Sequence, residues 1–574
     1  MNVTIYAPYG WWSPHFETEL ELAERHLEKS DEVTFITCDA ALHFCEVNPE
    51  HAYEQCRLCY GRAREGLKHL SSPVQAFKLS DLIVQAKESM ALLHKLPKSY
   101  HSFDELYQLK FENFDLGAAV LSSLNSFLND PEPDPAVDQE VTWSILSAAF
   151  AAYVALDVYL KRYSCDLFYV LNGRLANFRA ALRACQKHGV RCLVHERGCD
   201  LYSYSLAENT MPHDPAHITK YLADTLGKAE SPAQKRAVAK EFYSERREGK
   251  IANWVSLTEQ QIRGSVPEGW LESPLRIAAF SSTESEFSCL REFFPSPLYP
   301  SQAEGFETII HDLARNRFEG IFAIRMHPNS ARTKADFTER LRLLPYPFLR
   351  VIGPEEKIDS YALLQTANKV LTFGSTIGIE AAYRGVPSIS ARWAAYEDLG
   401  STYNAKTHDE LLRLLLEPLD PKPVDGAIDF GYYAKTFGDR LKYVSPLSAF
   451  SCTFKGEFIR PQWPYLLFNR ALTGDPIRID WPHPQALVRQ NGVVTGVMIG
   501  NDKMALGRFE GMFAAGLIKP ETEEMEWPWN LLYPALINWE KKRLKALYQG
   551  RELRPDPLNL MVAFERKRPV DEDT

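Results

Sequence analysis

Short apolar runs alternate with amphipathic segments from the beginning of the chain. Residues 2–9 and 32–39 are rich in β-branched and aromatic side chains, and residues 15–30 between them repeat apolar side chains at helical spacing. This alternation predicts a βαβ unit with parallel strands. Because the same order returns at residues 165–198, we expect a Rossmann-like α/β domain over residues 1–265.

A second series of alternating runs follows a segment at residues 264–274 that contains Gly and Pro. Its strand-like runs are residues 275–282, 318–328, 348–353, 369–375 and 386–391. The series predicts a second doubly wound, Rossmann-like domain over residues 270–425, with a cleft between the two domains. Beyond it, the aromatic and proline-rich sequence 426–574 predicts a mostly helical extension that packs on both domains.

Length and composition agree with a large globular protein. A chain of 574 residues is too long for one hydrophobic core. A formal charge of -10 argues against a general attraction to nucleic acid. The N-terminus enters a strand pattern without the features of a signal peptide, so we expect a cytoplasmic protein. The apolar stretch 143–160 is interrupted by Asp157, which favours a buried helix over a membrane span.

Four of the ten cysteines are clustered in the sequence: Cys38, Cys45, Cys56 and Cys59. A C-x2-C pair with two further thiols upstream can bind zinc tetrahedrally, because thiolates are soft ligands. The spacing matches no standard zinc finger, and buried free thiols explain the cluster equally simply. Structural zinc is one prediction here, and an iron–sulfur cluster is a weaker one.

The ends of the strands in the second domain carry the polar residues that can bind a ligand. In an open parallel sheet, ligands bind beyond the carboxyl ends of the strands. The candidate residues are Ser282 and Thr283 after the first strand, Arg325 and His327 after the second, and Gly374, Ser375 and Thr376 before a helix. A Gly with two hydroxyl residues at a helix start predicts a phosphate site.

Two details of this site have alternative explanations. Glu380, farther along the helix, can bind a ribose diol, or it can pair with Arg384. Arg325 and His327 project to the same side if the chain is extended, and they reach the Ser375 anion site if their strand is a neighbour. Alternatively, His327 is a structural residue bonded to a loop carbonyl.

The stretches "RMHP", "GSTIGIEAAYRGVPSI" and "FSSTESEF" resemble bacterial glycosyltransferases with two Rossmann-like domains, the GT-B architecture. The likeness is to the sialyltransferases and Kdo transferases of capsule and surface-polysaccharide synthesis. It implies that His327 with Pro328, and Ser375 with Thr376, contact the CMP part of a nucleotide-sugar donor. UDP-sugar enzymes with a similar turn bind ribose through the residue corresponding to Glu380, so UDP is the second choice of nucleotide.

An inverting transfer also needs a base for the acceptor hydroxyl and a charge that stabilises the departing phosphate. We expect Glu196, at the end of a first-domain strand, to be the base, with His195 as the second candidate, and His327 to neutralise the phosphate. The related sialyltransferases have an acid-acid-Gly motif, whereas "HERG" has one acid. The candidate acceptor-binding residues are Gly10, Trp11, Trp12, Asn172 and Arg174.

The resulting expectation is a glycosyltransferase that needs no metal for catalysis and binds a nucleotide sugar and a glycan. The basic run 541–545 suggests contact with an anionic membrane near a lipid-linked acceptor, although a solvated helix face explains it as well. The alternatives are a nucleotide-sugar 2-epimerase, a CDP-polyol phosphotransferase and a non-catalytic subunit of a polysaccharide assembly complex.

Overall fold

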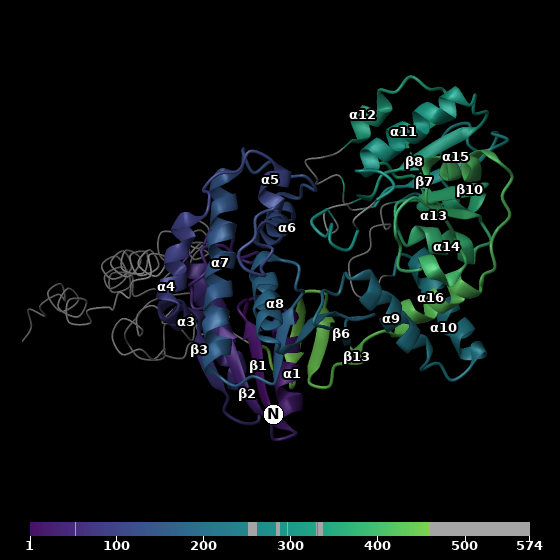
Figure 1. Cartoon of the computed structure of the whole chain (residues 1–574). Coiled ribbons are helices and arrows are strands. Elements are labelled where there is room, and N and C mark those ends of the chain that lie inside the picture. Colours follow the sequence, from purple (N-terminus) through teal and green to yellow (C-terminus); the bar gives the residue numbers. More distant parts are fainter. Residues whose placement is uncertain are drawn as a thin grey trace, which may run out of the picture.

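A computed structural model describes residues 1–51, 53–250, 261–282, 288–294, 297–328, 330 and 337–459. These residues form two α/β domains, each built around a mainly parallel sheet, with their helices on both faces (Figure 1). The two doubly wound domains expected from the sequence are thereby confirmed. Residues 460–574, which include most of the predicted extension and the basic run, lie outside the described residues.

The first sheet has the strand order β13-β6-β5-β4-β1-β2-β3. Its strands are β1 (Asn2–Ala7), β2 (Glu32–Thr37), β3 (Gln75–Lys78), β4 (Leu167–Leu171), β5 (Arg191–Arg197), β6 (Ser203–Glu208) and β13 (Asp439–Arg440). Strands β1 to β5 are parallel, and β6 and β13 are antiparallel to their neighbours. The central strands are buried on both faces, which explains their nearly continuous apolar sequence.

The helices of the first domain cover both faces of this sheet. They are α1 (His15–Leu27), α2 (Tyr53–Leu67), α3 (Leu79–Gln85), α4 (Lys87–Met90), η1 (Ala91–Lys95), α5 (Phe103–Tyr107), α6 (Leu116–Leu128), α7 (Gln139–Arg162) and α8 (Ala176–His188). One core joins the sheet to α3, α6, α7 and α8, and a smaller core joins the opposite face to α1.

Helix α7 resolves the question raised by the apolar stretch 143–160. Among the described residues it is the one helix long and apolar enough to cross a membrane, but 78% of its most apolar window is buried inside the protein. It packs against α3, α6 and α8. Asp157 is satisfied by Lys161 and His188 at the end of the helix. The predicted buried helix is confirmed.

The second sheet is parallel throughout and has the order β12-β11-β10-β7-β8-β9. Its strands are β7 (Arg276–Phe280), β8 (Ile321–Arg325), β9 (Leu349–Ile352), β10 (Lys369–Thr372), β11 (Ser388–Ser390) and β12 (Tyr403–Asn404). Its helices are α11 (Gln302–Arg315), α12 (Thr338–Arg342), α13 (Ser360–Thr366), α14 (Ile377–Tyr383), η3 (Glu397–Leu399) and α15 (His408–Leu416). Separate apolar clusters line its two faces.

Both sheets have the strand order of a Rossmann fold. In the first, β3-β2-β1 runs one way and β4-β5-β6 the other; in the second, β9-β8-β7 and β10-β11-β12 do the same. The order reverses between β1 and β4 and between β7 and β10. At such a switch point the loops leave in opposite directions, and a crevice opens beyond the carboxyl ends of the strands. The topology thus provides one crevice in each domain.

Two helices assigned to the first domain from the sequence pack instead with the second. These are α9 (Pro215–Leu226) and α10 (Pro232–Arg247), and they lie beside α16 (Asp425–Thr436) and α14 (Figure 1). Leu222 of α9, Ile379 of α14 and Phe430 of α16 belong to one apolar cluster. The predicted domain boundary at residue 265 therefore does not match the structure. Helices α9 and α10 precede that residue, but their apolar faces complete a cluster of the second domain.

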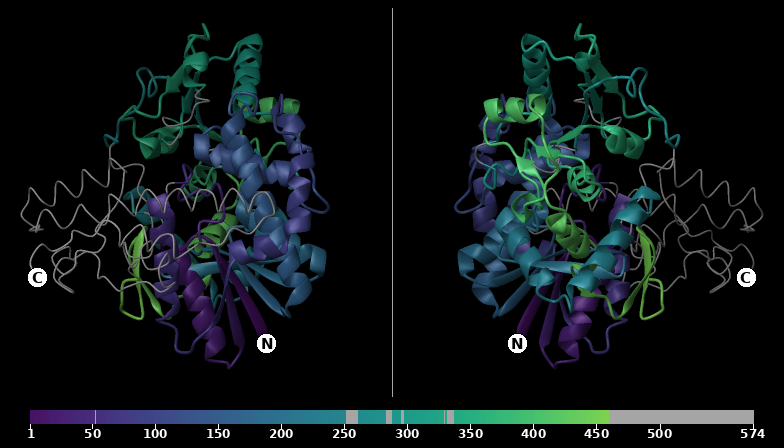
Figure 2. Two further views of the ribbon diagram at one scale, coloured as in Figure 1. Left: turned by 90° about the vertical axis from the view of Figure 1, so that its left-hand side faces the viewer. Right: turned by 90° about the vertical axis from the view of Figure 1, so that its right-hand side faces the viewer.

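After α16 the chain returns to the first domain. Strand β13 pairs with β6, and the hairpin of β14 (Val444–Ser448) and β15 (Ser451–Phe454) packs on α1, so the end of the described chain lies beside its beginning (Figure 2). The described part of the region after residue 425 therefore contains strands as well as a helix.

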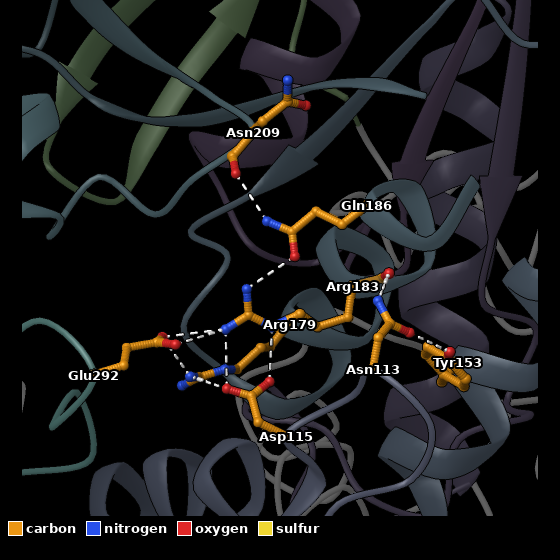
Figure 3. A network of polar contacts seen from close by, with 8 residues as sticks. All are labelled: Asn113, Asp115, Tyr153, Arg179, Arg183, Gln186, Asn209 and Glu292. Atoms are coloured by element: carbon orange, nitrogen blue, oxygen red, sulfur yellow. Dashed lines mark hydrogen bonds and ion pairs between the residues drawn. The ribbon is translucent and has the colours of Figure 1, made fainter. Parts of the chain in front are cut away.

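Residues 288–294, between β7 and α11 in the sequence, lie against the first domain, and we call them the crossing loop. Its residues Cys289 and Leu290 are buried in the core of the first domain. Next to them, Glu292 accepts hydrogen bonds from Arg179 (2.7 Å) and Arg183 (3.1 Å) of α8, and both arginines also contact Asp115 (Figure 3). Burial opposes ionisation of Asp115, yet the two arginines hold its pKa well below the usual range. This ion cluster joins the two domains.

Candidate functional site

A cavity of about 310 Å³ lies at the switch point of the second sheet, and we call it the second-domain cavity. Its wall includes Ser282 after β7, His327 after β8, and Gly374 and Ser375 after β10. The sequence predicted that these strand ends converge, and they line the same cavity. The prediction also required the strand before His327 to be the neighbour of the strand before Ser375. This part was wrong, because β7 lies between β8 and β10. Thr283, also predicted at this site, lies outside the described residues.

Hydrogen bonds between the loops hold this wall in place. The Ser282 hydroxyl donates to the Phe373 carbonyl (2.9 Å), and the His327 backbone N–H donates to the Ser281 hydroxyl (2.8 Å). The Tyr396 hydroxyl donates to the Ser375 carbonyl (2.6 Å). The three strand ends are thus tied to one another or to a neighbouring loop, which fixes the position of the side chains around a ligand.

Gly374 occupies a position that no other residue fits. Its φ is +81°, and a Cβ there would lie 2.6 Å from the Trp393 carbonyl oxygen. The residue therefore needs both the left-handed backbone conformation and the absence of a side chain. This close approach brings the loop after β10 against the loop after β11.

Substituting Gly374 with alanine will lower the free energy of unfolding by about 2–4 kcal/mol, the sum of a left-handed backbone cost and a steric overlap. In the function proposed below, this cavity holds a nucleotide, and the substitution will then also abolish nucleotide binding, because the wall of the cavity has to move. Gly385→Ala is the matched control: Gly385 has φ +73° and open space around its Cβ position, so about 1–2 kcal/mol is expected without a binding defect. Urea denaturation and nucleotide titration measure both effects, and equal losses in the two variants would contradict the steric argument.

Several residues of this cavity were missed in the sequence, among them a cation and an aromatic residue after β11. Arg392 and Trp393 follow β11 and line the cavity beside Ser375, and the Trp393 ring contacts Phe294 of the crossing loop with centroids 5.5 Å apart. The strand at residues 386–391 was predicted, but no Gly or hydroxyl pattern marks its end. A cation followed by an aromatic residue at the carboxyl end of a strand was the available signal.

Two predicted phosphate-site residues, Arg325 and Thr376, do not line the second-domain cavity. The Arg325 side chain is 3% exposed, and its guanidinium donates to the Gly353 carbonyl at the end of β9. The extended strand ends at Arg325, so the alternation that would have aligned it with His327 does not continue. Thr376 is exposed, and its hydroxyl accepts a hydrogen bond from Arg246 (3.1 Å).

Glu380 is also placed differently from the prediction. Its side chain is fully buried, and its two carboxylate oxygens accept hydrogen bonds from Arg246 Nε and the Tyr361 hydroxyl, each at 2.7 Å. Because the carboxylate is also completely buried, a ribose cannot reach it in this arrangement. The alternative prediction, an ion pair between Glu380 and Arg384, was also wrong. The ion-pair partner of Glu380 is Arg246 of α10.

A second cavity, of about 780 Å³, lies at the switch point of the first sheet, and we call it the first-domain cavity. Trp12 after β1, Asn172 and Arg174 after β4, and Glu196 near the end of β5 line it. The predicted base and three of the predicted acceptor-binding residues are therefore brought together. Asn172 has φ +59°, and its amide donates to Glu196 (2.9 Å), whose other oxygen accepts from the Arg197 backbone N–H (3.0 Å).

Arg174 is the buried cation of this cavity. Its guanidinium donates to the Ser122 hydroxyl (2.9 Å) and lies 3.4 Å from that of Ser126, and the side chain is 7% exposed. Among the described residues no carboxylate forms an ion pair with it. Taking a cation out of water is costly unless an anion compensates it, so the first-domain cavity is suited to an anionic group.

Three first-domain candidates do not line this cavity. A Cβ on Gly10 would lie 2.7 Å from Ala63 Cβ and from the Cys59 carbonyl, so helix α2, rather than a substrate, needs the small residue. Trp11 is exposed, and its neighbour Trp12 is the tryptophan that lines the cavity. His195 is fully buried, with its Nε2 3.5 Å from Glu19, and has no access to a substrate.

None of the four clustered cysteines forms a disulfide bond with a described residue. Burial raises the pKa of Cys38 to about 11 and that of Cys59 to about 12, which favours the protonated form. Among the described residues, no group of three or more Cys, His, Asp or Glu side chains is arranged to hold a metal ion. The zinc and iron–sulfur interpretations have no geometric support there and stay predictions.

The two cavities adjoin. Pro212, His213 and Ile218, in and after the loop between β6 and α9, line both of them. Two facing Rossmann-like domains, each with a cavity at the switch point of its sheet, form the GT-B architecture. The sites in the two halves of the molecule are thereby parts of one interdomain site.

Comparisons with known proteins assign the chain to no family. No protein-family model and no curated protein matches the chain. A solved structure of KpsC, beta Kdo 2,4 transferase, from Thermosulfurimonas dismutans has a TM-score of 0.33 and 15% identity, covering 47% of this chain and 79% of that chain. The MnaA–UDP structure of S. aureus has a TM-score of 0.24 and 10% identity, covering 77% and 93%.

MurG of Acinetobacter baumannii has a TM-score of 0.23 and 12% identity, and the match covers 76% of this chain and 94% of that chain. With TM-scores this low, none of these similarities carries a conclusion about activity. The function has to be inferred from the residues of the chain itself.

Proposed function

We propose that this protein is a glycosyltransferase that moves a sugar from a nucleotide-sugar donor to a glycan acceptor. The observation that carries the proposal is the pair of adjoining cavities at the two switch points. Such a transferase binds two substrates at once and orients one for attack on the other. Two cavities with a shared wall meet this requirement.

In this proposal the second-domain cavity holds the nucleotide. Arg392 and His327 neutralise the phosphate, Ser375 donates a hydrogen bond to it, and Trp393 and Phe294 form an aromatic wall for the base. The His-Pro and Ser-Thr motifs favour a CMP-sugar, with a UDP-sugar next. The same resemblance favours a surface or capsule polysaccharide as the acceptor.

The first-domain cavity holds the acceptor. Trp12 offers an apolar face to a sugar ring, and Arg174 offers its buried charge to an acidic group. The acceptor hydroxyl attacks the anomeric carbon with inversion, and a base in this cavity takes its proton, for which Glu196 and His213 are the candidates. Because side chains supply the charge that stabilises the departing phosphate, the proposal requires no metal ion.

The test of the proposed function is nucleotide binding to the intact chain. CMP, UDP, GDP and CDP are each added and the melting temperature is measured. A ligand at 100 times its dissociation constant stabilises the folded protein by about 2.7 kcal/mol. We expect CMP to give the largest shift, with product formation only when an acceptor is added to the CMP-sugar.

Two neighbouring hydroxyls sharpen this test. Ser375→Ala will lower the affinity for the nucleotide by about 3- to 20-fold, because the charged phosphate loses the hydrogen bond from the hydroxyl. Thr376→Ala is the matched control and will bind the nucleotide unchanged, since Thr376 is exposed and outside the cavity. Equal affinities for the two variants would contradict the placement of the phosphate. Conversion of a nucleotide sugar without acceptor would favour a 2-epimerase, and binding without turnover a non-catalytic subunit.

A further inference from the structure

His213 stands where the two cavities meet. It lines the first-domain cavity together with Arg174 and Glu196, and the second-domain cavity together with His327. Pro212 and Ile218, which share this position, carry no group that exchanges a proton. Among the described residues, His213 is therefore the titratable side chain that lines both cavities.

The backbone around His213 is held in a defined position. The next residue, Asp214, caps α9 by accepting a hydrogen bond from the Ala216 N–H (2.9 Å), and the Thr210 hydroxyl donates to its other oxygen (2.7 Å). The imidazole itself is partly buried. A side chain presented by a fixed helix start suits proton transfer, which depends on precise placement.

The electrostatic surroundings keep the imidazole neutral. Burial, followed by repulsion from Arg174, lowers the pKa of His213 to about 4, and the charge of Glu196 opposes this shift. A neutral imidazole can accept a proton, and the nearby carboxylate stabilises the cation that forms. The other charged and titratable groups lining the first-domain cavity are His15, Glu46, Arg197, His217, Tyr221 and Tyr433.

Glu196 is less well placed for direct proton transfer. Its oxygens accept hydrogen bonds from Asn172 and from the Arg197 backbone N–H, and it lines the first-domain cavity but not the second. These bonds orient its carboxylate without bringing it to the boundary where the donor's anomeric carbon would lie.

Building on the proposed function, we propose that His213 is the base of the transfer reaction and that Glu196 is its positioning residue. In this step the acceptor hydroxyl loses its proton to an imidazole nitrogen while its oxygen bonds to the anomeric carbon of the donor. The bond between that carbon and the phosphate oxygen breaks, and its electron pair leaves with the nucleotide. Glu196 stabilises the imidazolium until the proton returns to water.

The first test is a binding measurement that needs no known acceptor. Protein with 15N-labelled histidine is titrated between pH 3 and 8 with and without CMP, and the resonance missing from His213→Gln identifies His213. We expect CMP to shift the His213 resonance and to leave that of His217 unchanged, because His217 lines only the first-domain cavity. Glu196→Gln will move the His213 titration to lower pH, since it removes the charge that favours the imidazolium. A resonance insensitive to both changes would overturn the proposal.

The second test uses turnover of the nucleotide sugar that stabilises the wild-type protein. His213→Ala and His213→Gln will lower kcat by about 10²- to 10⁴-fold while the donor KM stays within a few-fold. The acidic limb of the pH profile will disappear in these variants. His311→Ala is the matched control and will keep kcat within a few-fold of wild type, because His311 lies on α11 outside both cavities. If Glu196→Gln removes the limb and His213→Gln retains it, Glu196 is the base and our proposal is wrong.

Different results would contradict the proposed function and the assignment of His213 as the base. If no nucleotide binds the wild-type protein, the proposed function is wrong whatever His213 does. If wild-type transfer is observed and His213→Gln retains it within about tenfold, only the assignment of His213 is wrong. Circular dichroism shows whether each variant is folded. If the His213 variants are unfolded, the effect of Glu196→Gln on the His213 titration tests the assignment instead.

Discussion

Replacing His327 with alanine will remove most of the nucleotide-dependent stabilisation of this protein and lower kcat/KM by about 10²- to 10³-fold. His327 lines the second-domain cavity, and its backbone is held by the hydrogen bond to Ser281. In the proposed function, the His327 ring lies beside the position where the departing phosphate gains charge. Groups that are already oriented toward developing charge contribute more to a transition state than to ground-state binding. The defect should thus be larger in kcat than in donor KM.

The measurements are a CMP titration by calorimetry and turnover with the preferred donor. His311→Ala is the matched control, because His311 lies on α11 and contacts Tyr346 at the surface (2.9 Å), away from either cavity. It should bind CMP and turn over as the wild type does. If His327→Ala gives the same CMP-dependent shift as the wild type, the phosphate is not bound at this position.

The second large effect is expected at the ion cluster between the domains. Arg179→Met will lower the free energy of unfolding by about 3–5 kcal/mol, because it leaves Asp115 and Glu292 without their buried cation. The Arg179 side chain is fully buried, whereas Arg183 supplies only part of the compensating charge (Figure 3). Since Glu292 belongs to the crossing loop, the substitution should also weaken CMP binding through Phe294.

Urea denaturation and a CMP titration of the same variant measure both consequences. Arg191→Ala is the control for loss of an arginine ion pair: Arg191 pairs with Glu208 at 3.0 Å, but both side chains are more than half exposed. Such exposed pairs contribute about 0–1 kcal/mol. If the two substitutions lower the free energy of unfolding equally, the buried cluster stabilises the protein no more than an exposed ion pair does.

The parts of the site that were predictable are those set by strand topology. The apolar runs before Ser282, His327 and Ser375 mark strands, and parallel strands present their carboxyl ends at one edge of a sheet. The same reasoning located Glu196, Asn172 and Arg174 together in the first domain. Local pattern was sufficient because each of these residues lies within three positions of the end of its strand.

The parts that were not predictable depend on partners distant in sequence. Glu380 was predicted to bind ribose because its partner could not be foreseen. That partner, Arg246, belongs to α10, which the sequence assigned to the other domain. Arg325 turned to the Gly353 carbonyl because its strand ends there. His213 lies in a loop with no motif, and only the meeting of two cavities shows its position.

The return of the chain to the first domain after residue 436 affects how the protein is made. Buried Glu21 of α1 accepts hydrogen bonds from the backbone N–H groups of Lys442 (2.9 Å) and Tyr443 (2.6 Å), and β13 covers the edge of β6. On the ribosome, these partners emerge only after the whole second domain has been synthesised. Until then the nascent first domain has an uncovered strand edge, and Glu21 lacks these two backbone donors and keeps Arg25 of its own helix as its ion-pair partner. We therefore expect chaperones to bind the unfinished chain.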